Sequence, residues 1–167
     1  ITSADRAIEL DPESVPAHFT KGGALTVSAL REMGRGEDPR ETLEQAIASF
    51  ESAIAIDPGF VLAHDDLGYA WERKARYEMD IGLDPRPSLD HAVAAFQRAI
   101  EINPDYANAY NNSGIALWRR GRFEQRTGSD PGDTLTEAIA AFGAAIERNP
   151  TYAYAFANRG LARRTLA

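Results

Sequence analysis

The chain repeats itself with a fixed step of 46 residues. One ladder of Asp-Pro and Asn-Pro pairs has its prolines at positions 12, 58, 104 and 150, and a second ladder of Asp-Pro pairs has its prolines at 39, 85 and 131. Glycine recurs at 22, 68, 114 and 160, and phenylalanine at 50, 96 and 142. Several ladders in one register indicate a stack of equivalent units in which each unit packs on its neighbours.

The hydrophobic spacing inside each unit is helical. In residues 43–54 the apolar side chains fall at i, i+3, i+4, i+7, i+10 and i+11, and the next two units repeat this pattern. This spacing places them on one face of an α-helix. That helix is expected to end at the Asp/Asn-Pro pair, because proline disfavours helix in the residue before it. An earlier helix of about 20 residues is expected to begin near Ala17, Ala63 or Ala109. A Gly-x-Asp-Pro turn that starts at 36, 82 and 128 separates the two helices.

Two local features give further expectations. Thr42, Ser88 and Thr134 precede the first leucine of the second helix, where we expect them to act as N-caps. The Asp-Pro pairs just before them are expected to form turns and to cap helices rather than to form a functional row of carboxylates. The mid-helix glycines cost about 1 kcal/mol each relative to alanine. They predict a close approach of the second helix, whose Ala46 and Ala53 offer small surfaces.

Each unit resembles a tetratricopeptide repeat (TPR). The second unit shows the pattern most fully, with His64, Leu67, Gly68, Trp71, Ala92, Phe96, Ala99 and Pro104. The resemblance implies an all-α fold, a right-handed solenoid of antiparallel helix hairpins. The family's usual unit has about 34 residues, so the longer step implies an extended first helix in each hairpin. Lengthened repeats of this kind resemble arrays in bacterial signalling proteins, including ones attached to serine/threonine kinase domains.

The repeat register places the whole chain in one continuous array of repeats. Residues 1–15 correspond to the end of a truncated repeat and residues 154–167 to the first helix of another, with full repeats at 16–61, 62–107 and 108–153. A hairpin cannot bury its apolar face without neighbours. We therefore expect the parent protein to continue in both directions.

Composition and motifs argue against several classes of function. A net charge of −7 argues against nucleic-acid binding, and no apolar stretch approaches the roughly 20 residues of a membrane span. The acidic residues gather in residues 1–83, which hold 16 acidic and 8 basic side chains, whereas residues 84–167 hold 9 and 10. With no cysteine the compartment stays open, and the cytoplasm is favoured.

The sequence carries no recognisable catalytic motif. Phosphate loops, nucleophile elbows and paired zinc-binding histidines do not occur in it. His18 and His64 occupy a position that holds a bulky packing residue in the family, so we expect packing rather than metal ligation. We predict no enzyme activity, no cofactor and no metal site.

The resemblance implies a peptide-binding groove lined by the first helices. The positions expected to face this groove are Asp66, Tyr69, Arg73, Asn108, Asn111, Asn112, Ile115, Trp118, Arg119, Tyr154 and Asn158, and Asp65 and Glu72 are expected to be exposed beside them. Asparagine amides can both donate to and accept from a peptide backbone. Asn112 and Asn158 share one repeat position, which resembles the asparagine ladder of O-linked N-acetylglucosamine transferase.

The predicted function is a non-catalytic scaffold that binds an extended peptide or a partner protein in this groove. The carboxylate clamp of the co-chaperones in this family is not expected, because its first pair of positions reads Phe19 and Gly23, or Asp65 and Tyr69. The alternative is a structural spacer or a segment that self-associates through its exposed repeat ends. The sequence does not identify the partner.

Overall fold

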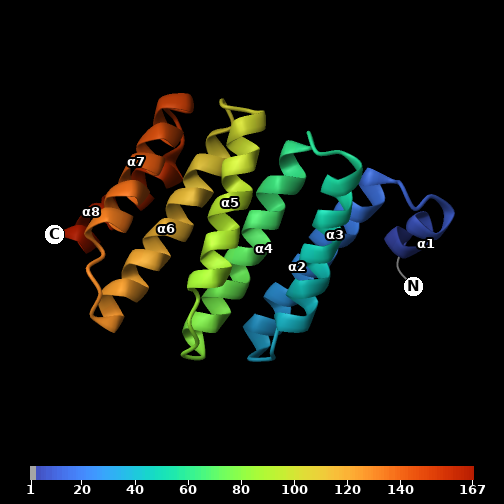
Figure 1. Cartoon of the computed structure of the whole chain (residues 1–167), viewed down its shortest axis with the longest axis horizontal. Helices are drawn as coiled ribbons and strands as arrows, with labels where there is room; N and C mark the ends of the chain where they lie inside the picture. Colours follow the sequence, from blue (N-terminus) through green and yellow to red (C-terminus); the bar gives the residue numbers. More distant parts are fainter. Residues whose placement is uncertain (1–2) are drawn as a thin grey trace.

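The computed structural model describes residues 3–167, and within that range it contains α-helices and no strand. Figure 1 shows the helices side by side in chain order along the long axis, with the two termini at opposite ends. Consecutive helices pack as antiparallel pairs. The helices are α1 (Ser3–Leu10), α2 (Val15–Arg35), α3 (Arg40–Ile56), α4 (Val61–Asp80), α5 (Arg86–Ile102), α6 (Ala107–Thr127), α7 (Gly132–Arg148) and α8 (Ala153–Leu166).

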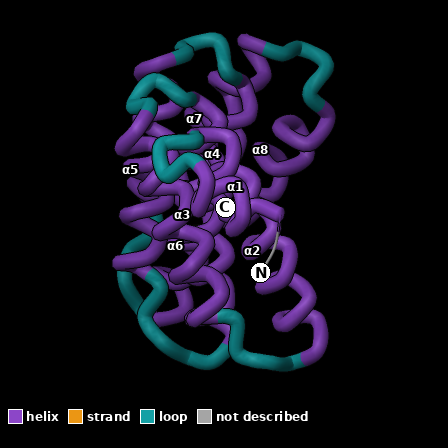
Figure 2. Tube along the Cα trace, turned by 90° about the vertical axis from the view of Figure 1, so that its right-hand side faces the viewer, coloured by secondary structure: helices purple, strands orange, loops and turns teal. Residues whose placement is uncertain are grey.

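The helices form two layers. The first helices of the hairpins, α2, α4, α6 and α8, contact one another directly along the stack. Within residues 3–167 the second helices, α3, α5 and α7, make no such contacts among themselves. The array therefore curves toward the surface formed by α2, α4, α6 and α8, which we call the first-helix face. The turns gather at the two edges of the stack, as Figure 2 shows.

A phenylalanine on each second helix packs directly on a glycine of the first helix. A Cβ added to Gly68 would lie 2.6 Å from the ring of Phe96. Gly22 and Gly114 meet Phe50 and Phe142 at 2.7 Å in the same way. All three rings are fully buried. The glycines were expected to face alanines, but it is an aromatic ring that occupies the space left by the missing side chain.

The second helices begin earlier than the N-cap prediction placed them. They start at Arg40, Arg86 and Gly132, so Thr42, Ser88 and Thr134 lie inside the first turn, and the N-cap prediction is wrong. The aspartate before each proline caps the helix instead. Its Oδ1 accepts the backbone N–H two residues later, at 3.1 Å for Asp38, 3.0 Å for Asp84 and 2.9 Å for Asp130. This agrees with the turn and capping role expected of the Asp-Pro ladder.

The first helices reach the expected length. The helices α2 and α6 have 21 residues and α4 has 20. At the predicted turns the chain leaves the helix through Gly36, Gly82 and Gly128, whose φ angles are 76°, 80° and 81°. A side chain is strained at such a φ, which explains glycine at these positions.

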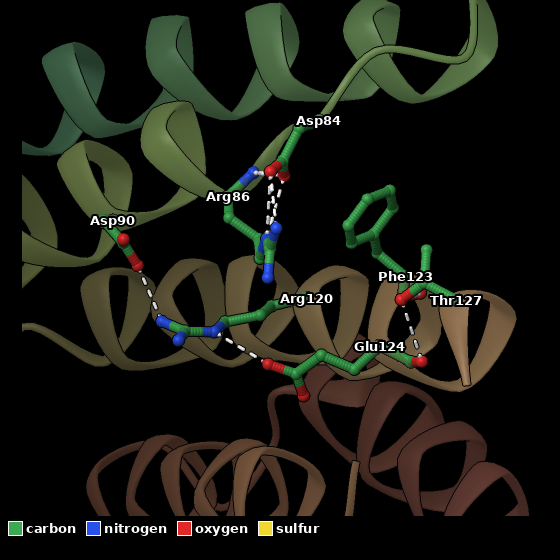
Figure 3. Close-up of polar contacts among 7 residues, drawn as sticks. All are labelled: Asp84, Arg86, Asp90, Arg120, Phe123, Glu124 and Thr127. Atoms are coloured by element: carbon green, nitrogen blue, oxygen red, sulfur yellow. Dashed lines mark hydrogen bonds and ion pairs between the residues drawn. The ribbon is translucent and has the colours of Figure 1, made fainter. Parts of the chain in front are cut away.

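One ion pair and one arginine–ring contact join α6 to the preceding hairpin (Figure 3). Arg120 on α6 donates to Asp90 on α5 at 2.6 Å and to Glu124 on its own helix at 3.0 Å. Arg86 pairs with Asp84 at 2.7 Å and lies 5.6 Å from the ring centre of Phe123. Exposed pairs contribute at most about 1 kcal/mol each, so the burial of Phe123 is the stronger attachment. In the described part of the chain, no helix combines the length and the apolar character needed to cross a bilayer.

The glycine–phenylalanine contact predicts opposite effects at two equivalent positions. We expect Gly68→Ala to destabilise the fold by about 1–3 kcal/mol, because the new methyl group meets the buried ring of Phe96. Gly160 has nothing within 4 Å of an added Cβ, so Gly160→Ala is expected to stabilise α8 by up to about 1 kcal/mol. Urea unfolding followed by circular dichroism measures both. Equal effects of the two substitutions would contradict the contact.

Candidate functional site

Two pockets lie along the first-helix face. The larger pocket, between α6 and α8, has a volume of about 170 Å³ and is lined by Arg73, Ile115, Trp118, Arg119, Phe142, Asn158 and Leu161. The smaller pocket, between α4 and α6, has a volume of about 30 Å³ and is lined by Tyr69, Glu72, Arg73, Phe96, Asn112 and Ile115. Each lining position of the smaller pocket falls on a lining position of the larger one after a step of 46 residues. The repeat therefore builds the same pocket twice.

The pockets combine an apolar base with a polar rim. Phe96 and Phe142, the buried rings that pack on the helix glycines, form the base of one pocket each. Ile115 lines both pockets and is only partly buried. Arginine and asparagine side chains from the first helices surround this apolar surface. Such a mixture suits a ligand that inserts an apolar group and hydrogen bonds around it.

Polar side chains link each first helix to the next one. Asp65 accepts hydrogen bonds from Asn112 Nδ2 at 3.1 Å and from the Tyr106 hydroxyl at 3.2 Å. One repeat later, Asn158 Nδ2 donates to Asn111 Oδ1 at 3.0 Å. Both of these hydrogen bonds from an asparagine amide join residues 47 apart in the sequence. Because the repeat step is 46, each residue bonds to the residue just after its own equivalent in the next repeat.

A second row of contacts follows the same offset. Glu72 pairs with Arg119, and Trp118 Nε1 donates to Thr165 Oγ1 at 3.1 Å. The exposed fractions are 7% for Asp65, 2% for Glu72 and 4% for Asn111, so the prediction that these residues are exposed is wrong. Their polar groups hold neighbouring repeats together instead of facing solvent.

The wall of the larger pocket carries more positive than negative charge. Glu72 lies between two guanidinium groups, since Arg73 Nε is 2.9 Å from its second carboxylate oxygen and Arg119 pairs with the first. Arg73 also lies 4.4 Å from the ring centre of Tyr69. One carboxylate between two arginines leaves one positive charge in surplus.

Two aspartates make the start of α4 acidic. Burial, and to a smaller extent the charge of the neighbouring Asp65, raise the pKa of Asp66 to about 6. Burial also raises the pKa of Asp65, although hydrogen bonds from Asn112 and Tyr106 oppose that shift. The pKa of Tyr106 rises to about 12, first through burial and then through the nearby Asp65 charge. The first-helix face is therefore acidic near the start of α4 and basic near Arg73.

The structure brings most of the sequence-predicted groove residues together. Those that line the two pockets are Tyr69, Arg73, Asn112, Ile115, Trp118, Arg119 and Asn158. Asp66, Asn108, Asn111 and Tyr154 do not line them. Asn108 and Tyr154 are exposed near the starts of α6 and α8, whereas Asn111 is buried. Their role in binding stays a prediction.

Sequence reasoning missed the residues that support the face from beneath or from the turns. The sequence placed Phe96 and Phe142 on the apolar face of the second helix and did not predict that their rings form the base of the pockets. Tyr106 was not considered. The recurrence of an aromatic residue at 60, 106 and 152, just before each first helix, was the available signal.

The histidines have structural partners. His18 Nε2 lies 2.9 Å from the carbonyl oxygen of Pro12, and His64 Nε2 lies 3.1 Å from that of Pro58. Each bond ties the start of a first helix to the turn before it. His91 stacks on Trp71 with ring centres 4.5 Å apart. Across residues 3–167 no cluster of three or more histidine, aspartate or glutamate side chains is arranged to hold a metal ion.

Residues 88–121 match the family model described as TPR repeat. This window begins in α5 and ends at Gly121 within α6, before the extended end of that helix. No curated protein matches the sequence.

Solved structures show the same fold over nearly the whole chain. The crystal structure of MamA protein has a TM-score of 0.65 at 23% identity, over 97% of this chain and 69% of that one. The second TPR domain of human RPAP3, in complex with the HSP70 peptide SGPTIEEVD, has a TM-score of 0.60 at 15% identity, over 90% and 98% of the two chains. The first TPR of Spaghetti (RPAP3), bound to the HSP90 peptide SRMEEVD, has a TM-score of 0.55 at 18% identity, over 89% and 94%. The chain thus has the TPR fold.

The raised pKa of Asp66 predicts how stability depends on pH. An ordinary aspartate titrates near pH 4, so the folded state holds the Asp66 proton more tightly than the unfolded state does. The stability from this proton is present at low pH and is lost as pH rises from about 4 to about 6. We expect Asp66→Asn to raise the free energy of unfolding at about pH 7 and to change it little at about pH 4.

Urea unfolding at the two pH values measures the Asp66 effect, and a carboxyl NMR titration should place the Asp66 midpoint near 6. Asp38→Asn is the control of opposite sign. A hydrogen bond from Arg40 lowers the pKa of Asp38 to about 2. Removing the Asp38 carboxylate is therefore expected to lower the free energy of unfolding at neutral pH. An Asp66 midpoint near that of a free aspartate would contradict the burial argument.

Proposed function

We propose that the chain is a non-catalytic scaffold that binds an extended peptide segment of a partner protein along the first-helix face. The observation that carries the proposal is the pair of equivalent pockets between α4, α6 and α8. A pocket that recurs at a regular spacing suits a ligand whose side chains are also regularly spaced. An extended polypeptide is the simplest such ligand.

The spacing of the pockets defines the expected register of the peptide. Packed helices lie roughly 8–10 Å apart, and an extended strand rises about 3.3 Å per residue. Side chains about three residues apart would therefore enter consecutive pockets. The larger pocket has room for a bulky apolar side chain, whereas the smaller one holds about a methyl group or a water molecule.

The rim supports a peptide with some acidic character. Arg73 and Arg119 share the single carboxylate of Glu72, so a carboxylate on the ligand would meet the surplus positive charge. Partners of this kind have precedent in the RPAP3 domains, which hold HSP70 and HSP90 peptides. The chaperone carboxylate clamp is not proposed here, because Phe19 and Gly23 stand at its first pair of positions.

A selection from random nonapeptides displayed on phage tests the groove. We expect enriched sequences to share a bulky apolar residue, and Leu161→Glu to weaken binding of the selected peptides about tenfold or more, because it places a charge in the larger pocket. Fluorescence anisotropy with labelled peptides measures the change.

The matched control is Ala94→Glu, an equal change of charge on α5. Ala94 is exposed and lines a different pocket, between α3, α4 and α5. This variant should bind the selected peptides as the unmodified chain does. If Leu161→Glu leaves binding unchanged, the groove assignment is wrong.

The proposal extends to the parent protein. The 46-residue step of the helices supports a lengthened variant of the repeat, divided at residues 15/16, 61/62, 107/108 and 153/154. We propose that such an array serves a larger, cytoplasmic signalling protein as its interaction segment. The sequence that flanks the array in the full-length protein tests this assignment, since it would reveal an attached kinase or other effector domain.

A further inference from the structure

A further recess lies between the second helices α3 and α5, in the other layer of the array. Among residues 3–167 these two helices do not contact each other, although both pack on α4. The gap holds a pocket of about 380 Å³, with Leu67 and Trp71 of α4 at its base and Ile54, Ala55 and Ala94 on its walls. We call this recess the outer groove. Its volume is more than twice that of the larger pocket on the first-helix face, which is about 170 Å³.

The repeat itself creates the outer groove. Further helices pack on both sides of α3, α4 and α5 (Figure 1). Seven residues line a pocket of about 320 Å³ between α1, α2 and α3, and each falls on a lining position of the outer groove after one step of 46 residues. Lys21 stands there in place of Leu67, and Gln45 in place of His91. The outer groove is therefore the more apolar version of a recess that recurs with the repeat.

An aromatic ring held from three sides forms part of the base. His91 stacks on Trp71 with ring centres 4.5 Å apart, and Lys74 Nζ lies 5.1 Å from the centre of the Trp71 ring. Lys74 in turn pairs with Glu44 of α3 at 2.8 Å. These contacts fix the indole in place, although Trp71 is only partly buried. A rigid and partly exposed indole suits the anchoring of an apolar side chain from a partner.

The lining of the outer groove favours a helical ligand over an extended one. No asparagine or glutamine side chain lines it, whereas Asn112 and Asn158 line the pockets of the first-helix face. An extended peptide needs partners for its main-chain amide groups, but an α-helix satisfies these groups within itself. The small side chains at 55, 94 and 95 allow a helix to lie close to α3 and α5.

The wall formed by α3 carries a surplus of negative charge. Its acidic side chains, Glu41, Glu44 and Glu51, are all exposed. Lys74 balances the charge of Glu44. In the part of the chain that the structure describes, Glu41 and Glu51 make no ion pair. They are ten residues apart, about 15 Å along the helix, so two basic side chains about three turns apart on a ligand helix would reach both.

The wall formed by α5 is balanced in charge. Arg98 pairs with Glu101 on the same helix, and Asp90 pairs with Arg120 of α6. The two walls of the outer groove therefore differ, and a basic edge on a ligand is favoured against α3 rather than against α5.

We infer that the outer groove binds an amphipathic α-helix of a partner protein, with the apolar face of that helix on Leu67 and Trp71 and a basic edge along α3. Burial of the apolar face supplies the affinity, and the opposite charges orient the helix. This inference does not rest on the proposed peptide groove, because no residue lines both the outer groove and a pocket of the first-helix face.

Three designed peptides test the inference with the whole chain. The first has about 18 residues, enough to form a helix in isolation, with a leucine face and lysines along one edge. The second carries glutamates in place of the lysines, and the third is the first with a central proline, which breaks the helix. Fluorescence anisotropy should show that the lysine-edged helix binds about tenfold or more tightly than either of the other two.

Two substitutions in the chain locate the binding site. Ala94→Arg places a cation on the wall of the outer groove and should weaken binding of the lysine-edged helix about tenfold or more. Glu51→Lys reverses one charge on α3 and should weaken it about three- to tenfold. The matched controls are Gln97→Arg on α5 and Glu147→Lys on α7, since both residues are exposed and neither lines the groove. Circular dichroism checks that every variant is folded.

Three outcomes would overturn the inference: no binding of the lysine-edged helix, equal binding of the lysine-edged and glutamate-edged peptides, or equal effects of Ala94→Arg and Gln97→Arg. Leu161→Glu, in the larger pocket of the first-helix face, should not weaken binding of the helical peptide. Nonapeptides selected for that pocket are too short to form a stable helix and should bind the Ala94→Arg variant unchanged. Failure of the outer groove is thus distinguishable from failure of the peptide groove.

Discussion

The packing of a phenylalanine ring on a helix glycine is the contact on which the rest of the array depends. It recurs three times at the same register, at Phe50, Phe96 and Phe142. Each ring occupies space that any larger residue than glycine would fill, so it fixes the distance and the rotation between the two helices of a hairpin. The loss of helix propensity at the glycine, about 1 kcal/mol, is offset by the burial of a whole aromatic side chain.

The same contact shapes the surface used for binding in our proposal. Because Phe96 and Phe142 pack on glycines of the first helices, their buried rings form the base of the two pockets on the first-helix face. The core and the candidate site therefore share residues. A repeat that keeps its hairpin intact therefore also keeps its pocket.

The sequence predicted the helices well and the polar surface less well. The helix pairs, the extended first helices and the Gly-x-Asp-Pro turns follow from periodicity and from local backbone preferences, which neighbouring residues determine. The N-cap assignment failed at Thr42, because the preceding Asp-Pro pair already satisfies the helix start. The exposure of Asp65, Glu72 and Asn111 was also misjudged. Each of these three residues lies on the predicted face, but its side chain bonds to a residue of the next repeat.

The sequence by itself determined the step of the array, the number of residues in each hairpin and the face on which the groove residues gather, because all three follow from regular spacing along one chain. Only the tertiary structure decided which polar groups on that face remain free to bind. The reason is an offset of one residue between neighbouring first helices, which pairs Asp65 with Asn112 and Glu72 with Arg119. That offset is set by how the hairpins pack on one another, and the pattern within a single helix does not contain it.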